Sequence, residues 1–132
     1  MILEYAQLLS AAHHLNNNSI KDKLYKLSHT NHPSTVWVAG SAGAYNYVLS
    51  LFEALCKEYT HRYGKVHLSY KKCYHHFRSL NPCKRIATPI IPLCMPDKYK
   101  TDCPVQSYRN YYIGDKQHLR IWTKRHIPYW WR

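Results

Sequence analysis

The chain has 132 residues, which is enough for one domain with its own hydrophobic core. Hydrophobic residues make up 45% of it, and it has only four glycines and seven prolines, so disordered, collagen-like and low-complexity classes are excluded. The formal net charge of +12 favours a polyanionic partner, although a charge that serves only solubility stays an alternative.

Residues 1–15 are expected to form the first helix, because Ile2, Ala6, Leu9 and Ala12 recur at helical spacing. This stretch lacks a basic n-region, so it is interpreted as a core helix and not as a signal peptide. A short second helix is expected over residues 20–28. A third is expected to start after Pro33, and the glycines of residues 40–43 are expected to bend or break it.

The longest helix is expected from about residue 44 to residue 63. Its apolar stripe consists of Tyr45, Val48, Leu49, Phe52, Leu55, Cys56 and Tyr59. Glu53–Lys57 and Glu58–Arg62 are spaced as ion pairs on the exposed side, and Gly64 stands where a left-handed C-cap belongs.

Residues 67–79 are again expected to be helical. The segment 81–104 is expected to be an extended loop, since prolines interrupt it at Pro82, Pro89, Pro92, Pro96 and Pro104. Asp102 is expected to cap a helix that ends at Gly114, and Asp115 to cap a last helix that reaches about residue 125. These elements predict an all-α fold: a compact single-domain helical bundle over residues 1–132 with an aromatic C-terminal tail.

The five cysteines contain no C-x-x-C pair, and their number is odd. Reduced thiols in a cytoplasmic or nuclear setting are therefore expected, in a bacterial or phage-infected cell or in a eukaryotic nucleus. The set Cys73, His75, His76 and Cys83 matches no common zinc spacing. No metal or cofactor is expected, and no apolar run approaches the roughly 18 residues of a membrane span.

Positive charge is concentrated in the second half of the chain. Residues 1–66 hold six Lys and Arg against four Asp and Glu, whereas residues 67–132 hold thirteen against three. On the expected last helix, Lys116, Arg120 and Lys124 would form a basic ridge that could follow phosphates, or a face that is merely solvated.

Aromatic side chains follow the same distribution, with eleven of the nineteen in residues 67–132. They could stack on unpaired bases, or fill the core of a small helical domain. A second cluster of cations, Arg62, Lys65 and His67, surrounds Gly64. It is expected to face an anionic ligand, or to be an ordinary capped helix end.

Candidates for acid–base chemistry are few. The chain has seven carboxylates, no G-x-S-x-G elbow and no phosphate-binding glycine loop. Glu4 stands out because it lies on an otherwise apolar helix. A carboxylate near a core is costly unless it is paired or functional, although a helix N-terminus would also stabilise it.

Several short motifs resemble a family of small phage and bacterial proteins. They are "NHPSTVW" (31–37), "YNY" (45–47), "LCKEYTHRYGKVH" (55–67), "MPDKYK" (95–100), "YRNYYIGDK" (108–116) and the tail from Trp122 to Trp130. These proteins in turn look similar to the phage pyrimidine-dimer DNA glycosylases of the endonuclease V type.

The resemblance implies base-excision chemistry, in which an N-terminal amine forms a Schiff base with the sugar, a helical glutamate assists and basic residues grip kinked DNA. By this resemblance Glu4 is the catalytic candidate. The sequence departs from the family in two places. It starts inside the family's first motif, and Val38 and Ala39 stand where the family often has Arg-Glu. The front of the family domain is therefore expected to be missing, and the chemistry could be lost while binding remains.

The leading hypothesis is a DNA-binding protein, similar to a glycosylase or AP lyase, that acts on damaged or modified pyrimidines. Its expected DNA contacts are His32, Trp37, Arg62, Tyr63, Lys65, His67, Tyr99, Lys100, Arg109, Tyr112, Lys116, Arg120, Lys124, Arg125 and Trp130. The alternatives are a transferase that modifies phage DNA bases and a non-enzymatic protein that binds an acidic partner. The sequence does not indicate an oligomeric state.

Overall fold

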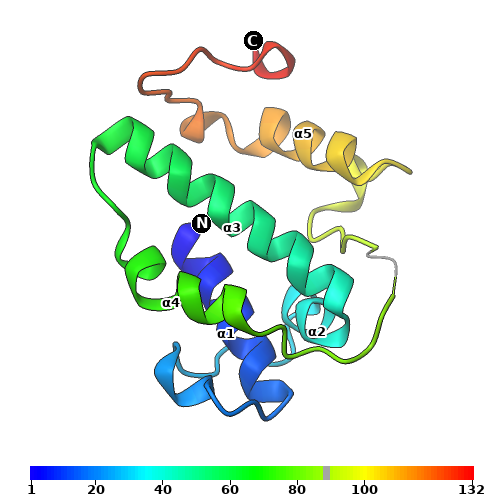
Figure 1. Ribbon diagram of the computed structural model, residues 1–132. Helices are drawn as coiled ribbons and strands as arrows, with labels where there is room; N and C mark the ends of the chain where they lie inside the picture. The colour runs from blue at the N-terminus through cyan, green and yellow to red at the C-terminus, as the bar shows by residue number, and fades with distance from the viewer. Residues whose placement is uncertain (88–89) are drawn as a thin grey trace. The chain divides into compact units, whose positions relative to one another are not determined.

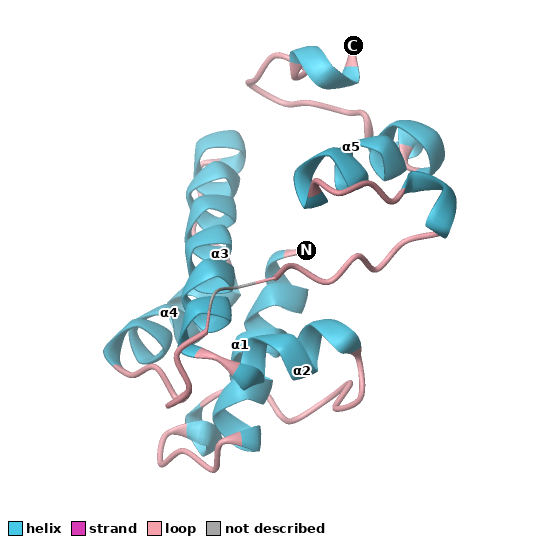
Figure 2. Cartoon of the chain, turned by 90° about the vertical axis from the view of Figure 1, so that its right-hand side faces the viewer, coloured by secondary structure: helices cyan, strands magenta, loops and turns pink. Residues whose placement is uncertain are grey.

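The computed structural model describes residues 1–87 and 90–132. These residues form helices, turns and loops and no strand, so the expected all-α class is confirmed (Figure 2). The chain divides into two compact units, Met1–Ile90 and Ile91–Arg132. The organisation as a single domain stays a prediction, and Pro89 of the expected proline-rich loop lies outside the described residues.

The first unit is built from α1 (Ile2–Leu15), the short 3-10 turn η1 (Lys21–Lys23), α2 (Pro33–Gly40), α3 (Ala42–Tyr63) and α4 (Leu68–Ser79). The long helix α3 contacts α1, α2 and α4, and α1 contacts both shorter helices (Figure 1). Four of the five helices expected in this part are confirmed. The helix expected over residues 20–28 is wrong, because only η1 forms and Leu24 alone of the segment is buried.

Helix α3 shows how the sequence sets its own boundaries. Ser41 separates it from α2, and the Ser41 Oγ accepts the Ala44 N–H at 3.1 Å, a standard N-cap. Gly64 ends the helix in the left-handed region at φ 68°, as expected. The two expected ion pairs also form, Lys57 Nζ to Glu53 Oε1 at 3.0 Å and Arg62 Nε to Glu58 Oε1 at 2.9 Å.

The core of the first unit lies along the buried stripe of α3. Tyr45 and Phe52 are fully buried, and Phe52 meets Phe77 of α4 edge-on with ring centroids 5.6 Å apart. Leu9 and Val38 complete the core from α1 and α2. The expected apolar stripe is therefore the face on which the three neighbouring helices pack.

A polar network lies inside this core. The Tyr45 hydroxyl donates to the Phe77 carbonyl at 3.1 Å and lies 2.7 Å from Nε2 of the fully buried His13. Because the single phenol proton goes to the carbonyl, Nε2–H of His13 donates to the Tyr45 oxygen. Burial lowers the pKa of His13 below its ordinary value of 6.5. The network therefore holds a neutral imidazole and supplies a partner to a carbonyl in the last turn of α4.

Two helices begin with a histidine cap. His32 Nδ1 accepts the Ser34 N–H at 3.1 Å before α2, and His67 Nδ1 accepts the Ser69 N–H at 3.0 Å before α4. An Nδ1 that accepts a hydrogen bond leaves the proton of a neutral imidazole on Nε2. Both rings are therefore held as Nε2–H donors.

The five cysteines fall into two groups. Cys56, Cys73 and Cys83 are buried in the first unit, and burial raises the pKa of each of these thiols to about 11. Cys94 and Cys103 are exposed in the second unit. All five lie in the described part of the chain and are reduced, which agrees with the expectation from their odd number.

The second unit consists of α5 (Pro104–Asp115) and three short 3-10 turns, η2 (Asp97–Tyr99), η3 (Gln117–Leu119) and η4 (Tyr129–Trp131). Each turn packs on α5. Pro104 occupies the first turn as expected, but the N-cap is Cys103 and not Asp102. Ser107, buried in α5, accepts the Thr101 N–H at 2.8 Å and so ties the preceding loop to the helix.

The expected last helix is wrong. Asp115 is the final residue of α5, and beyond it only η3 forms before an irregular segment in which Lys124 has a φ of 57°. Leu119 in η3 is 49% exposed. The segment lacks the apolar stripe that a short helix needs for tertiary support.

Two further properties concern the described residues alone. In residues 1–87 and 90–132, no helix is both long and apolar enough to cross a membrane. Within the same ranges, no three His, Cys, Asp or Glu side chains gather closely enough to hold a metal ion. Cys73 and Cys83 instead line the core, while His75 lies edge-on to His76 at 4.7 Å.

Candidate functional site

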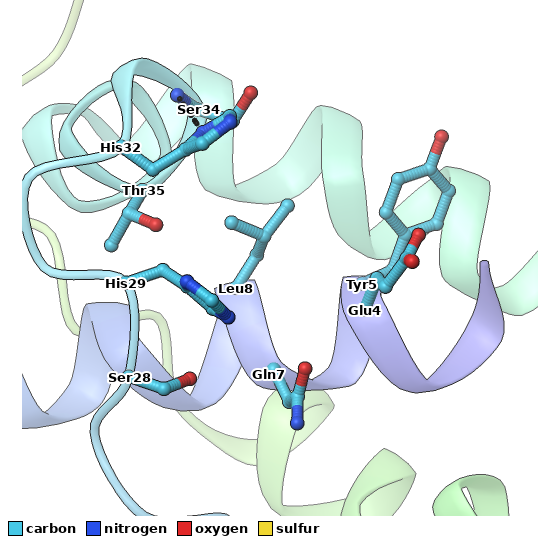
Figure 3. A pocket seen from close by; sticks show the side chains of 9 residues that line it. All are labelled: Glu4, Tyr5, Gln7, Leu8, Ser28, His29, His32, Ser34 and Thr35. Atoms are coloured by element: carbon cyan, nitrogen blue, oxygen red, sulfur yellow. Dashed lines mark hydrogen bonds between the residues drawn. The ribbon is translucent and has the colours of Figure 1, made fainter.

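A cleft of about 400 Å³ opens between α1 and the segment that leads into α2 (Figure 3). One wall comes from α1 and consists of Glu4, Tyr5, Gln7 and Leu8. The other wall comes from the loop and the first turn of α2 and consists of Ser28, His29, His32, Ser34 and Thr35. The cleft therefore brings together Glu4 and His32, two residues that the sequence analysis singled out for different reasons.

The loop wall of the cleft is rich in hydrogen-bonding groups. Thr35 is fully buried, and neither its Oγ1 nor the buried Oγ of Ser28 has a hydrogen-bond partner in the protein. His32 presents Nε2–H because its Nδ1 is the cap of α2 (Figure 3). His29 lies in the left-handed region at φ 50°, which is uncommon for a residue with a side chain. The wall thus combines an oriented donor with two hydroxyls that can donate or accept.

Glu4 sits at the open side of the cleft. Its side chain is 75% exposed and lies 3.8 Å from the N-terminal amine through Oε2. Of the two alternatives for Glu4, a carboxylate near the core therefore does not apply. Its place in the first turn of α1 is instead favourable, since the positive end of the helix dipole stabilises an anion there.

A second candidate surface lies wholly within residues 91–132. Aromatic rings follow one another in contact along α5 and η4. Tyr99 lies 5.5 Å from Tyr111, Tyr112 meets Trp131 edge-on at 5.6 Å, and Trp131 stacks parallel to Trp130 at 5.5 Å.

Cations lie over three rings of the second unit. Lys98 Nζ is 4.7 Å from the Tyr99 centroid, Lys116 Nζ is 5.2 Å from that of Tyr111, and the Arg109 guanidinium is 5.4 Å from that of Trp130. Such contacts hold flexible cations in place at a protein surface. We refer to Lys98, Tyr99, Arg109, Tyr111, Tyr112, Lys116, Trp122, Trp130 and Trp131 together as the basic aromatic ladder.

The charge of the second unit is strongly positive. Residues 91–132 contain eight Lys and Arg against three Asp, a formal balance of +5. Lys100 is partly neutralised, because its Nζ lies 2.7 Å from Asp97 Oδ1 and lowers the pKa of that carboxyl. Arg120, Lys124 and Arg125 are exposed on the irregular segment after η3. The expected helical ridge of Lys116, Arg120 and Lys124 therefore does not exist.

The cation cluster around Gly64 has a largely structural explanation. Arg62 is paired with Glu58, and His67 caps α4 while its ring meets Tyr59 edge-on at 4.9 Å. Lys65 is exposed, and Tyr63 is 56% exposed. Trp37, another expected DNA contact, packs at the edge of the core and meets Tyr47 edge-on at 6.1 Å.

Some members of the two surfaces were not among the expected site residues. They are Gln7, Ser28, His29 and Thr35 in the cleft, and Lys98, Tyr111, Trp122 and Trp131 in the ladder. The ladder residues had a sequence signal, namely aromatic residues one or three positions from a cation. The cleft residues had none, because only the path of the loop brings them to α1.

Comparisons of the chain with protein-family models, with curated proteins and with solved structures find no match. The resemblance to the pyrimidine-dimer glycosylases therefore stays a prediction.

Proposed function

We propose that the protein binds nucleic acid and that residues 91–132 supply the contact surface. The observation that carries this proposal is the basic aromatic ladder, in which three cations are held over aromatic rings in a unit with a formal charge of +5. A nucleic acid offers phosphates to the cations and base planes to the rings. The partner that we favour is DNA.

The ladder favours unpaired or distorted strands over a regular duplex. Trp130 has Trp131 stacked beside it and Arg109 over its ring, so its role is to hold the guanidinium in place and not to receive a base itself. A guanidinium plane can stack on a base, and Tyr129 offers a ring that is 76% exposed. Each stacked base contributes about 1–3 kcal/mol, which is available only where bases are unpaired.

The test is a titration of fluorescently labelled single-stranded and duplex DNA across a salt series. Arg109→Ala and Lys116→Ala should each weaken binding and each reduce the slope of log K against log[salt] by about 1. Lys26→Ala is the matched control, because Lys26 is an exposed lysine of the first unit outside the cleft. Equal slopes for all three variants would refute the ladder as the contact surface. An absence of any DNA binding would favour an acidic protein partner.

A second proposal is glycosylase or AP-lyase chemistry on damaged or modified pyrimidines. The specific observation in its favour is that Glu4, a solvated carboxylate, lines a cleft that also contains His29 and His32. A carboxylate at such a site can stabilise the cationic sugar that develops as the base leaves, or move a proton. Incubation with DNA that carries an abasic site, followed by borohydride, would trap a Schiff base. A trapped adduct that Glu4→Gln abolishes would support this chemistry, and no adduct would refute it.

A further inference from the structure

We propose that the cleft between α1 and the start of α2 is a binding site for an uncharged nucleoside and that it discriminates against phosphorylated ligands. The ligand is a free nucleoside, because a nucleoside unit within a strand carries phosphates on both sides. The inference uses residues of the first unit only. It rests neither on DNA binding by the ladder nor on any reaction of Glu4.

The first argument is the pair of buried hydroxyls. Oγ1 of the fully buried Thr35 lines the cleft, and its hydroxyl points toward the α1 side (Figure 3). Neither this atom nor Ser28 Oγ has a hydrogen-bond partner in the protein, although unpaired buried polar atoms are rare and destabilising. Two such atoms in the wall of one cleft indicate a ligand that both donates and accepts hydrogen bonds.

The second argument is the mixed character of the other polar groups. His32 presents a fixed Nε2–H donor, since its Nδ1 is used as the cap of α2. Gln7 on the opposite wall has an amide that can donate and accept at once, the group that pairs with the edge of a nucleobase. A nucleoside meets these requirements, because its base edge and its sugar hydroxyls carry both donors and acceptors.

The third argument is shape. Leu8 and the ring of Tyr5 form the apolar part of the α1 wall, against which a flat base can pack. The volume of about 400 Å³ is within the range of small-molecule sites. His32, the N-cap of the short helix α2, and the buried Thr35 in its first turn would fix the base edge, and the sugar would extend toward the opening.

The fourth argument is charge. Glu4 is the one lining residue with a permanent formal charge, and the lining contains no Lys or Arg. The first turn of α2 also offers little to an anion, because Pro33 has no N–H and the Ser34 N–H is taken by His32. The cation nearest to Glu4 is the N-terminal amine, 3.8 Å from Glu4 Oε2, and it is already paired with that carboxylate, so a phosphate at the opening would meet Glu4 without a cation of its own. This arrangement favours a nucleoside over its 5′-monophosphate.

The test measures heats of binding of the full chain with adenosine, guanosine, cytidine and thymidine, and with their 5′-monophosphates. At least one nucleoside should bind, and it should bind about tenfold or more tightly than its monophosphate. Glu4→Gln should reduce this preference by strengthening the binding of the monophosphate. A monophosphate that binds the unaltered protein as tightly as the nucleoside would overturn the charge argument and the proposal.

Thr35→Val is the central variant, because valine keeps the shape of threonine and removes only the hydroxyl. It should weaken nucleoside binding about tenfold while the melting temperature stays unchanged or rises, since an unpaired buried hydroxyl is lost. Thr123→Val, at an exposed position of the second unit, is the matched control and should change neither quantity. Ser28→Ala serves as a second variant should Thr35→Val fail to fold.

A single-stranded oligonucleotide that contains 2-aminopurine tests the alternative that the cleft takes a base within a strand. Binding of a free nucleoside that depends on Thr35 would support the proposal. A change in fluorescence of the oligonucleotide alone, removed by Thr35→Val, would overturn it in favour of a base within a strand. If neither depends on Thr35, the proposal is overturned. The Arg109→Ala salt slope, which reports on the ladder, should be the same with or without the cleft substitution.

Discussion

Removal of one oxygen atom from the core, by Tyr45→Phe, should destabilise the first unit strongly. Tyr45 is fully buried, and its hydroxyl has two partners, the Phe77 carbonyl at 3.1 Å and His13 Nε2 at 2.7 Å. Phenylalanine fills the same space but leaves a carbonyl and an imidazole N–H without partners in a dry environment. The substitution therefore tests the hydrogen bonds with almost no change in packing.

The expected magnitude follows from these two orphaned groups. Each buried polar group that loses its partner costs about 1–3 kcal/mol, so Tyr45→Phe should lower the free energy of unfolding by about 2–6 kcal/mol. For a chain of this length the melting temperature should fall by about 10 °C. Because domains of this kind have a total stability of about 5–15 kcal/mol, the loss is easily measured.

The assay is urea unfolding followed by far-ultraviolet circular dichroism at pH 7.5. Tyr47→Phe is the matched control, since Tyr47 lies on the same helix but is 36% exposed. The double variant His13→Leu, Tyr45→Phe removes the orphaned imidazole and should cost less than the sum of the two single substitutions. If Tyr45→Phe lies within about 0.5 kcal/mol of the unaltered protein, the network does not stabilise the core and the reasoning is refuted.

Three further predictions concern the first unit. Burial lowers the pKa of His13, with smaller effects of His14 and His76 in the same direction, so the unfolded chain binds more protons than the folded protein below pH 6.5. The free energy of unfolding should therefore fall as the pH falls from 6.5 toward the lower folded-state pKa, and should not depend on this group above 6.5. A pH series of urea unfolding tests this, and a flat profile would contradict it. Ser41→Ala removes the cap of α3 and should lower the free energy of unfolding by about 1 kcal/mol in the same assay. Ser50→Ala, on the exposed side of that helix, should lower it less, and equal effects of the two substitutions would argue against the cap. Gly64→Ala should cost about 1 kcal/mol because of the backbone φ of 68° alone, since an added Cβ there meets no atom within 4 Å. Gly40→Ala is the control, with the same open space but a helical backbone, and should be neutral or stabilising. A neutral Gly64→Ala would show that the turn tolerates a side chain.

The parts of the fold that could be predicted are those with a local signal. The stripe of α3 repeats over about four turns and lies between Ser41 and Gly64, so periodicity and capping agree on one helix. Residues 115–125 and 20–28 carry only two or three apolar side chains each. Whether such short segments form a helix depends on a packing partner, and the sequence does not reveal one.

In the candidate site too, only residues with a local sequence signal could be predicted. Arg109, Lys116 and Trp130 of the ladder were expected because cations and aromatic residues crowd one region of the sequence. Their pairing over particular rings depends on the turn that brings η4 back to α5, and no sequence pattern predicts the register of that turn. In the cleft, Thr35 and Ser28 resemble any loop or cap residues until the loop path is known. A buried hydroxyl without a partner is a property of three-dimensional surroundings alone.

Because the chain contains both exposed and buried thiols, cysteine labelling can measure local opening of the first unit. A maleimide should modify Cys94 and Cys103 in the native state, since both are exposed, and leave the three buried thiols, which are both shielded and largely protonated at neutral pH. Mass spectrometry then distinguishes a doubly labelled native chain from one labelled at all five positions. The rate at which Cys56, Cys73 and Cys83 acquire label under native conditions measures how often the helices of the first unit separate, without denaturant and without an introduced probe.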